Sequence, residues 1–237
     1  AMSLTQVPSD ADLSLPAVRH LNWDRPFFWL QAGWRDLKAN PLPSLAYGIL
    51  FGLGGDLIIL ALFSRPHLVT VAVSGFFLIA PLLAAGLYEL SRRTANGEKI
   101  LFIDSVLCFR RNGQSLALFG LFIAIAIVLW ERFSAISFGL LGSSHGVDTA
   151  AYLSKIVFSG EHSTFVAAWF ALGGLLALLV FALSVVSVPL MLDRNSDFIT
   201  AMKTSWRAFA SNSMPLLLWG AIIVLLTLTG FATFLFG

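Results

Sequence analysis

An acidic side chain inside a long apolar stretch is the first residue of this sequence that could do chemistry. Asp56 follows Gly54 and Gly55 and has apolar residues on both sides. A carboxylate in the interior of a membrane is costly and usually faces a protein interior or a water-filled cavity. Asp56 is therefore a candidate proton- or cation-binding group, and the alternative is a hydrogen-bonded acid that only stabilises helix packing.

Charged residues also gather where two apolar stretches end: Glu89, Arg92, Arg93, Asp193 and Arg194. Pro81 lies ahead of the first group and Pro189 lies ahead of the second. Pairing of these charges at a membrane surface is one interpretation. The other is a polar vestibule, in which the two prolines bend their helices and open the backbone toward a substrate, as broken helices do in transporters.

Metal-ligating residues are few and dispersed: His20, His67, Cys108, His145 and His162. The segment 134–163 also holds Asp148 and Glu161, but the spacing of its possible ligands matches no metal-binding motif. Neither a G-x-S-x-G nucleophile elbow nor a phosphate-binding P-loop occurs. The sequence thus predicts no metal, no cofactor and no catalytic site.

The elements that position these residues follow from composition. Of the 237 residues, 57% are hydrophobic and 12% are charged, and the mean hydropathy is +0.83. A soluble domain carries about 25% charged residues, so this composition indicates an all-α polytopic membrane protein. The net charge of +2 gives no support to a nucleic-acid partner.

Apolar stretches of the roughly 20 residues that a membrane-spanning helix needs occur five times. We predict spans at 43–64, 67–90, 115–133, 164–191 and 213–236. The first two are close enough in sequence to form an antiparallel hairpin, and the fourth is long enough to bend at Pro189. Asp56 would then lie about 10–14 Å from the outer end of the first span, at about 1.5 Å per residue.

Basic residues predict the orientation of these spans. All but three of the 15 lysines and arginines fall in the amino-terminal segment or in the segments after the second and fourth spans. The exceptions are Arg65, Arg132 and Lys155. Because cytoplasmic loops carry the excess of positive charge, we expect a cytoplasmic amino terminus.

A repeated pattern precedes the odd-numbered spans. Trp34, Arg35 and Asn40 recur at the same offsets as Trp206, Arg207 and Asn212, and a fainter copy covers 105–112. Three repeat units follow, each an interfacial helix plus a helical hairpin. The predicted divisions are a tail at 1–26 and units at 27–95, 96–195 (with the outer segment 134–163) and 196–237, the last of which we expect to lack a sixth span.

The segments that hold the repeated pattern are amphipathic. In 196–210, residues such as Trp206 fall on an apolar face, and Lys203 and Arg207 fall on a charged one. The segment 27–38 has the same pattern. Tryptophan and arginine suit the headgroup layer, so these helices are predicted to lie in the membrane surface, with a ligand-binding role as the alternative.

The chain resembles a family of uncharacterised bacterial integral membrane proteins that is catalogued as a domain of unknown function. The resemblance covers almost the whole sequence and rests on the segments 33–37, 44–48, 81–91 and 189–194. It implies six spans and a place in the bacterial inner membrane. Family members sometimes carry a cytochrome c oxidase label. Haem–copper catalysis needs several histidines inside the membrane, and here we expect all four, His20, His67, His145 and His162, to lie outside the spans.

Function is predicted less sharply than architecture. We expect a non-catalytic accessory, scaffold or assembly component, whose partners are the lipid bilayer and another membrane complex, with a respiratory complex among those that the oxidase label suggests. The alternative is a small-solute transporter, or one linked to protons or cations, that uses Asp56.

Overall fold

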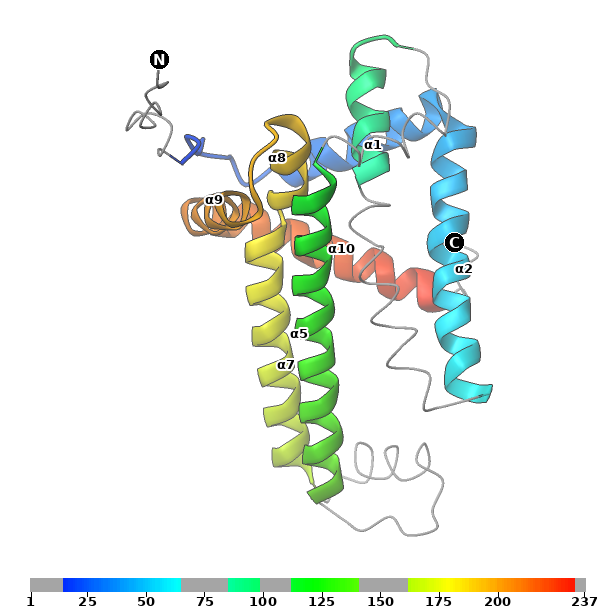
Figure 1. The fold of residues 1–237 in the computed structure, drawn as a ribbon, viewed down its shortest axis with the longest axis vertical. Helices are drawn as coiled ribbons and strands as arrows, with labels where there is room; N and C mark the ends of the chain where they lie inside the picture. The colour runs from blue at the N-terminus through cyan, green and yellow to red at the C-terminus, as the bar shows by residue number, and fades with distance from the viewer. Residues whose placement is uncertain (1–14, 65–84, 99–111, 141–161, 233–237) are drawn as a thin grey trace, which may run out of the picture.

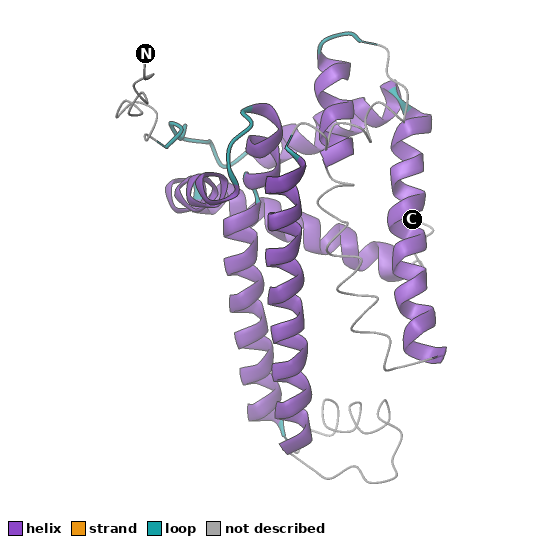
Figure 2. Ribbon diagram, viewed as in Figure 1, coloured by secondary structure: helices purple, strands orange, loops and turns teal. Residues whose placement is uncertain are grey.

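The chain is helical throughout the part that the structure describes. The computed structural model describes residues 15–64, 85–98, 112–140 and 162–232. Within these residues every regular element is a helix (Figure 2). Among the described residues, three segments are long and apolar enough to cross a membrane: Gly113–Ser137, Ser163–Asp193 and Ser213–Gly230. The prediction of an all-α membrane protein is confirmed, and these segments coincide with the third, fourth and fifth predicted spans.

The helices are α1 (Arg25–Ala39), α2 (Pro41–Ser64), an unlabelled helix at 85–95, α5 (Gly113–Leu140), α7 (Ser163–Ser184), α8 (Ser187–Asp193), α9 (Phe198–Ser211) and α10 (Ser213–Ala232). The first predicted span coincides with α2. Most of the second predicted span lies outside the described residues, and its described end continues as helix to residue 95. The helix α5 runs past the predicted end at residue 133, because α7 packs beside its last turns.

The helices α5 and α7 lie side by side over most of their length (Figure 1). The rings of Trp130 and Trp169 are 5.3 Å apart, and the Trp169 indole N–H donates a 3.0 Å hydrogen bond to Ser134 Oγ. A Cβ added at Gly173 would lie 2.7 Å from the Trp130 ring. The glycine therefore makes the room that lets the two helices approach closely.

The packed core of the molecule lies where α5 begins and α8 ends. It consists of Ala85, Leu116, Phe119, Leu190, Met191 and Ala201. These residues come from the helix at 85–95, α5, α8 and α9, so segments far apart in the sequence meet here. This end of the molecule therefore positions the charged residues that the sequence singles out.

The helix α9 lies across this end of the α5–α7 pair (Figure 1). Its buried face is made of the small residues Ala201, Thr204 and Ser205. Of its large apolar residues, Ile199 and Trp206 are exposed, whereas Phe198 packs against the core and Phe209 meets the Phe181 ring of α7. Part of the apolar face predicted from the sequence is thus free to contact lipid, and the rest joins the small side chains in the contact with the bundle.

The remaining helices make fewer contacts with the α5–α7 pair. In Figure 1, α10 runs across the direction of that pair; it packs mainly against α1 and α9, and its Gly220 lies beside Phe181 of α7. Trp29 of α1 meets Trp219 of α10 edge-to-face at 5.6 Å. Tyr47 of α2 is buried, with its hydroxyl against Gly86, where an added Cβ would overlap the tyrosine oxygen. Glycine is required at that position because any side chain would meet the tyrosine.

The predicted boundaries between the repeat units fall in two turns that share a geometry. After the helix at 85–95, Gly97 has φ of 72°, and the N–H groups of Gly97 and Glu98 donate to the carbonyls of Thr94 and Arg93. After α8, Asn195 has φ of 50°. A left-handed residue just past the last turn is a common way to end a helix. The division into three units itself stays a prediction.

Candidate functional site

The helix that contains Pro189 is interrupted in front of it. The α7 helix ends at Ser184 and α8 begins at Ser187. Proline has no N–H group, so Pro189 cannot donate to the carbonyl of Val185. The sequence predicts a bend at Pro189 itself. The interruption lies in the preceding turn, because the carbonyl of Val185 has no N–H donor at position 189.

A serine from another helix completes the interruption. Ser205 of α9 donates a 2.8 Å hydrogen bond to the carbonyl of Ala182 and accepts a 3.1 Å hydrogen bond from the N–H of Val186. In a continuous helix these two backbone groups would bond to each other. The hydroxyl of Ser205 is therefore inserted into the helix ladder, which is a recognised cause of helix kinks.

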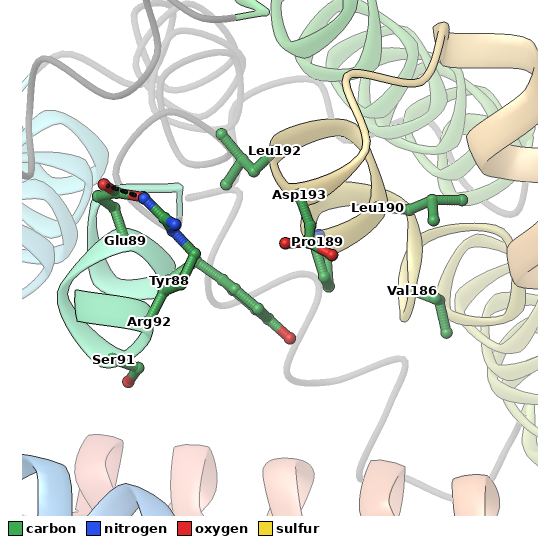
Figure 3. Close-up of a pocket in the computed structure, with 9 residues that line it drawn as sticks. All are labelled: Tyr88, Glu89, Ser91, Arg92, Val186, Pro189, Leu190, Leu192 and Asp193. Carbon is green, nitrogen blue, oxygen red and sulfur yellow. Dashed lines mark hydrogen bonds and ion pairs between the residues drawn. The ribbon is translucent and has the colours of Figure 1, made fainter. Parts of the chain in front are cut away.

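A cavity of about 420 Å³ opens beside the interruption (Figure 3). One wall comes from the helix at 85–95 and carries Tyr88, Glu89 and Arg92. The opposite wall comes from α8 and the turn before it, and it includes Pro189 and Asp193. Figure 3 shows the Tyr88 ring reaching toward the α8 wall, while Arg92 turns back toward Glu89. The structure thus brings together both charged groups that the sequence analysis names.

Glu89 differs from Asp193 in its surroundings. Its side chain is 4% exposed and binds two arginines, with Arg92 Nη2 at 2.8 Å and Arg93 Nε at 2.7 Å. The Arg92 guanidinium makes a second bond to Glu89 through Nε at 2.9 Å, and this hydrogen bonding raises the pKa of Arg92. Asp193 and Arg194 are both exposed. Glu89 is consequently a structural partner of arginines, whereas the Asp193 carboxylate faces the cavity.

A second cavity, of about 670 Å³, continues from the first. The two share Tyr88, Ser91, Val186 and Pro189, and the second reaches α1 and the α9–α10 junction, where Asn212 lines it. The combined cleft can therefore hold a polar group at Asp193 and Tyr88 and apolar groups further in. Nothing in the cleft couples a nucleophile to a base among the described residues.

The three repeat asparagines occupy one kind of position. The backbone carbonyls of Asn40, Asn112 and Asn212 accept from the N–H four residues later, at 3.2, 3.1 and 3.2 Å, in the first turns of α2, α5 and α10. Each side chain also reaches a distant segment. Asn40 Nδ2 donates to Thr94 Oγ1 at 2.7 Å, and Asn112 Nδ2 donates to the carbonyls of Met191 and Ser196.

Asn212 makes its distant contacts with the amino-terminal segment. Its amide accepts a 2.7 Å hydrogen bond from the N–H of Leu21 and donates a 3.0 Å hydrogen bond to the carbonyl of Arg19. The first two asparagines instead bind the turns in which the helix at 85–95 and α8 end. All three asparagines donate through Nδ2 to these distant partners, and Asn212 also accepts through Oδ1.

Two residues of this region, Phe119 and Ser205, were not identified from the sequence. Phe119 is 2% exposed, and with Gly120 it follows Asn112 at the offsets at which Tyr47-Gly48 follow Asn40. This spacing is a signal that a comparison of the three copies could find. Ser205 carries no such signal, because an inserted hydroxyl depends on which helix lies next to the interruption.

The other sequence candidates lie away from the cleft. Asp56 is exposed on α2 and lines neither cavity. Trp34 and Arg35 are exposed on α1, as are Trp206 and Arg207 on α9. Pro81, Cys108, His145, Asp148 and Glu161 lie outside the described residues. Within the described part of the chain, no three acidic, histidine or cysteine side chains are grouped as a metal site.

Comparison with known proteins gives one match. A family model described as a predicted integral membrane protein (DUF2189) matches residues 68–193, which is more than half of the 237-residue chain. The match includes Glu89, the helix interruption and Asp193. No curated protein and no solved structure matches.

Proposed function

Since the chain belongs to the family of predicted integral membrane proteins DUF2189, we propose that it is a non-catalytic component of a larger membrane assembly. The observation that carries this proposal is the exposure of Asp56 on α2. The helix presents this carboxyl group to a membrane-spanning helix of a partner protein.

The cost of leaving Asp56 in lipid supports a partner. Its neighbours Leu53 and Leu57 are 55% and 63% exposed, which suits contact with acyl chains. Acyl chains offer no hydrogen bond, so a carboxylate among them costs about 2.5–3.5 kcal/mol near the bilayer centre. A hydrogen-bond donor on a neighbouring helix would offset this cost.

Two glycines on the same side of α2 support close approach by a second helix. Gly48, Gly52 and Asp56 follow one another at intervals of four, which places them on one face. An added Cβ at Gly48 or Gly52 would meet nothing within 4 Å. Small residues at such spacing let helix backbones pack closely in membranes, where Asp56 could then bond across the interface.

The test is purification of the full chain from its native membrane in mild detergent. We expect a stoichiometric membrane-protein partner, either another protein or a second copy of the chain, and its loss in Gly52→Leu and Asp56→Leu. Gly174→Leu is the matched control, because Gly174 on α7 also has open space around it. A monodisperse lone protein, or equal loss in the control, contradicts the proposal.

The interrupted helix favours transport as a second candidate function. Broken helices place backbone groups at substrate sites in many transporters, and here the cleft beside Pro189 holds Tyr88 and Asp193. Asp56, which the sequence analysis assigns to this function, lies elsewhere. Uptake of Na⁺ or K⁺ into proteoliposomes that is lost in Asp193→Asn would favour transport, and a flux equal to that of empty vesicles would count against it.

A further inference from the structure

A groove of about 580 Å³ lies between α9 and the adjoining ends of α5 and α7. Its walls include Phe122 of α5, Leu183 of α7 and Phe198 of α9, and the Phe122 and Phe198 rings are 6.2 Å apart. These walls are almost wholly apolar, and they come from three helices that the fold holds together. The groove is therefore a preformed apolar surface and is separate from the cleft at Pro189.

The side of the groove that α9 forms combines apolar and cationic residues: Ile199, Met202, Lys203, Trp206 and Arg207. Their spacing of three and four residues groups Ile199, Met202 and Trp206 in one stripe and places Lys203 and Arg207 along its flank, so the apolar and charged faces predicted for this helix meet at the groove. Among the described residues, Lys203 and Arg207 make no ion pair. Two cations thus stand at the edge of an apolar groove, next to an exposed indole ring.

This combination selects one class of ligand. A neutral acyl chain alone would leave the two cations without a counter-charge, and a free phosphate alone would leave the apolar wall uncovered. A phospholipid with an anionic headgroup matches both, and tryptophan is the side chain that favours the headgroup level. We infer that the α9 groove binds one anionic phospholipid, with its phosphate at Lys203 and Arg207 and an acyl chain along Phe122.

The other interfacial helix provides a comparison within the same chain. The α1 groove has a similar volume of about 600 Å³ and is lined by Phe27, Leu30 and Trp34 among others. Neither Arg35 nor Lys38 lines it, and Lys38 Nζ instead lies 5.3 Å from the centre of the Trp34 ring. The α1 groove therefore lacks the cationic edge, and the inference applies to α9 alone. It does not depend on what α2 binds.

Native mass spectrometry of the full chain in mild detergent tests this inference. The probes are phosphatidylglycerol, phosphatidylcholine and glycerol 3-phosphate, each at the same concentration. We expect the wild-type chain to retain phosphatidylglycerol about tenfold more than phosphatidylcholine, because charge-assisted hydrogen bonds fix the phosphate of a lipid that lacks its own cation. Glycerol 3-phosphate should not be retained, because it has no acyl chain. Equal retention of the two lipids, or retention of glycerol 3-phosphate, overturns the inference without reference to any variant.

Two double variants, which remove the same charge from α9 and from α1, test where the lipid binds. Lys203→Gln with Arg207→Gln should lower phosphatidylglycerol retention about tenfold. Arg35→Gln with Lys38→Gln removes the same charge from α1 and should change retention less than about twofold. An equal loss of phosphatidylglycerol retention in the two double variants would show that the lipid is attracted to surface charge in general, and it would overturn the assignment of the site to the α9 groove. Met202→Trp fills the groove without a change of charge and should also lower retention, and unchanged retention in this variant would contradict the groove.

Discussion

The two copies of the Trp-Arg-to-Asn pattern end in the same way and pack differently. Both α1 and α9 finish at an asparagine whose carbonyl accepts the first backbone bond of the next helix. The helix α9 buries Ala201, Thr204 and Ser205 against α7 and α8, whereas in α1 only Pro26 is buried. The pattern itself therefore specifies a helix end, and the surface that faces the headgroups stays a prediction. Whether the helix also becomes part of the core depends on the small residues between its large ones.

The largest expected effect comes from the inserted serine. Ser205→Val leaves the carbonyl of Ala182 and the N–H of Val186 without their partner, at about 1–3 kcal/mol for each group, so we expect a loss of about 3 kcal/mol in unfolding free energy. Unfolding in mild detergent, followed by circular dichroism, measures it. Gly33 holds the matching position of α1 and has open space, so Gly33→Ala should stabilise by up to about 1 kcal/mol.

Ser205→Thr keeps the hydroxyl and should recover part of the stability. If Ser205→Val had the same unfolding free energy as the wild type, the difference between α9 and α1 would not depend on the hydrogen bonds of Ser205.

The asparagines should differ by a smaller amount. Asn212 is 5% exposed and binds Leu21 and Arg19, so Asn212→Ala should cost about 2 kcal/mol. Asn40 makes its distant bond to Thr94 alone and is less buried, so Asn40→Ala should cost about 1 kcal/mol. Thr94→Val should add little to Asn40→Ala, because both changes remove the same bond. A full additional loss in the double variant would contradict that pairing.

The smallest effect concerns the first turns of the two helices. Asp197 Oδ1 accepts from the N–H of Thr200 at 2.9 Å at the start of α9. Hydrogen bonds from the Thr200 side chain and from this N–H hold the pKa of Asp197 below its ordinary value of 3.8. Asp197→Ala should cost about 0.5–1 kcal/mol at neutral pH. Asp24 makes no such bond at the start of α1, so Asp24→Ala should change stability by less than about 0.5 kcal/mol.

The pH dependence follows from the direction of that shift. Because the pKa of Asp197 is depressed in the folded state, its contribution is present above the unfolded pKa and is lost as pH falls through the folded pKa. The stability difference between wild type and Asp197→Ala should therefore shrink below about pH 4. A difference that stayed constant down to pH 2 would mean that the carboxylate charge is not what caps α9.

Sequence reasoning predicted the parts of the fold that depend on local composition. The third, fourth and fifth spans follow from runs of apolar residues, and the structure has long apolar helices at these places. The asparagine positions were predicted from spacing. The partners of those asparagines could not be, because Asn40 and Thr94 are 54 residues apart and Asn212 and Arg19 are 193 apart. The orientation in the membrane and the bacterial inner-membrane location remain predictions from charge and resemblance.

Glu89 and Asp193 also differ in how much of their surroundings follows from the local sequence. Glu89 and Asp193 look alike in the sequence, since each stands near arginines at the end of an apolar stretch. The structure buries Glu89 between Arg92 and Arg93 and leaves Asp193 open to a cavity. The ion pairs of Glu89 are local, because Arg92 and Arg93 follow it by three and four residues on the same helix. The cavity beside Asp193 could not be predicted in this way, because its opposite wall comes from the helix at 85–95.

Hydropathy, proline and backbone capping act over a few residues. The amino-acid sequence therefore predicts that this chain lies in a membrane, where its helices run and which asparagines separate them. The packing of the helices, in contrast, places Ser205 in the helix interruption, brings Asp193 and Tyr88 into one cleft, and sets two cations of α9 beside an apolar groove. Those features depend on contacts between segments far apart in the chain, and such contacts are specified by the packing of whole helices.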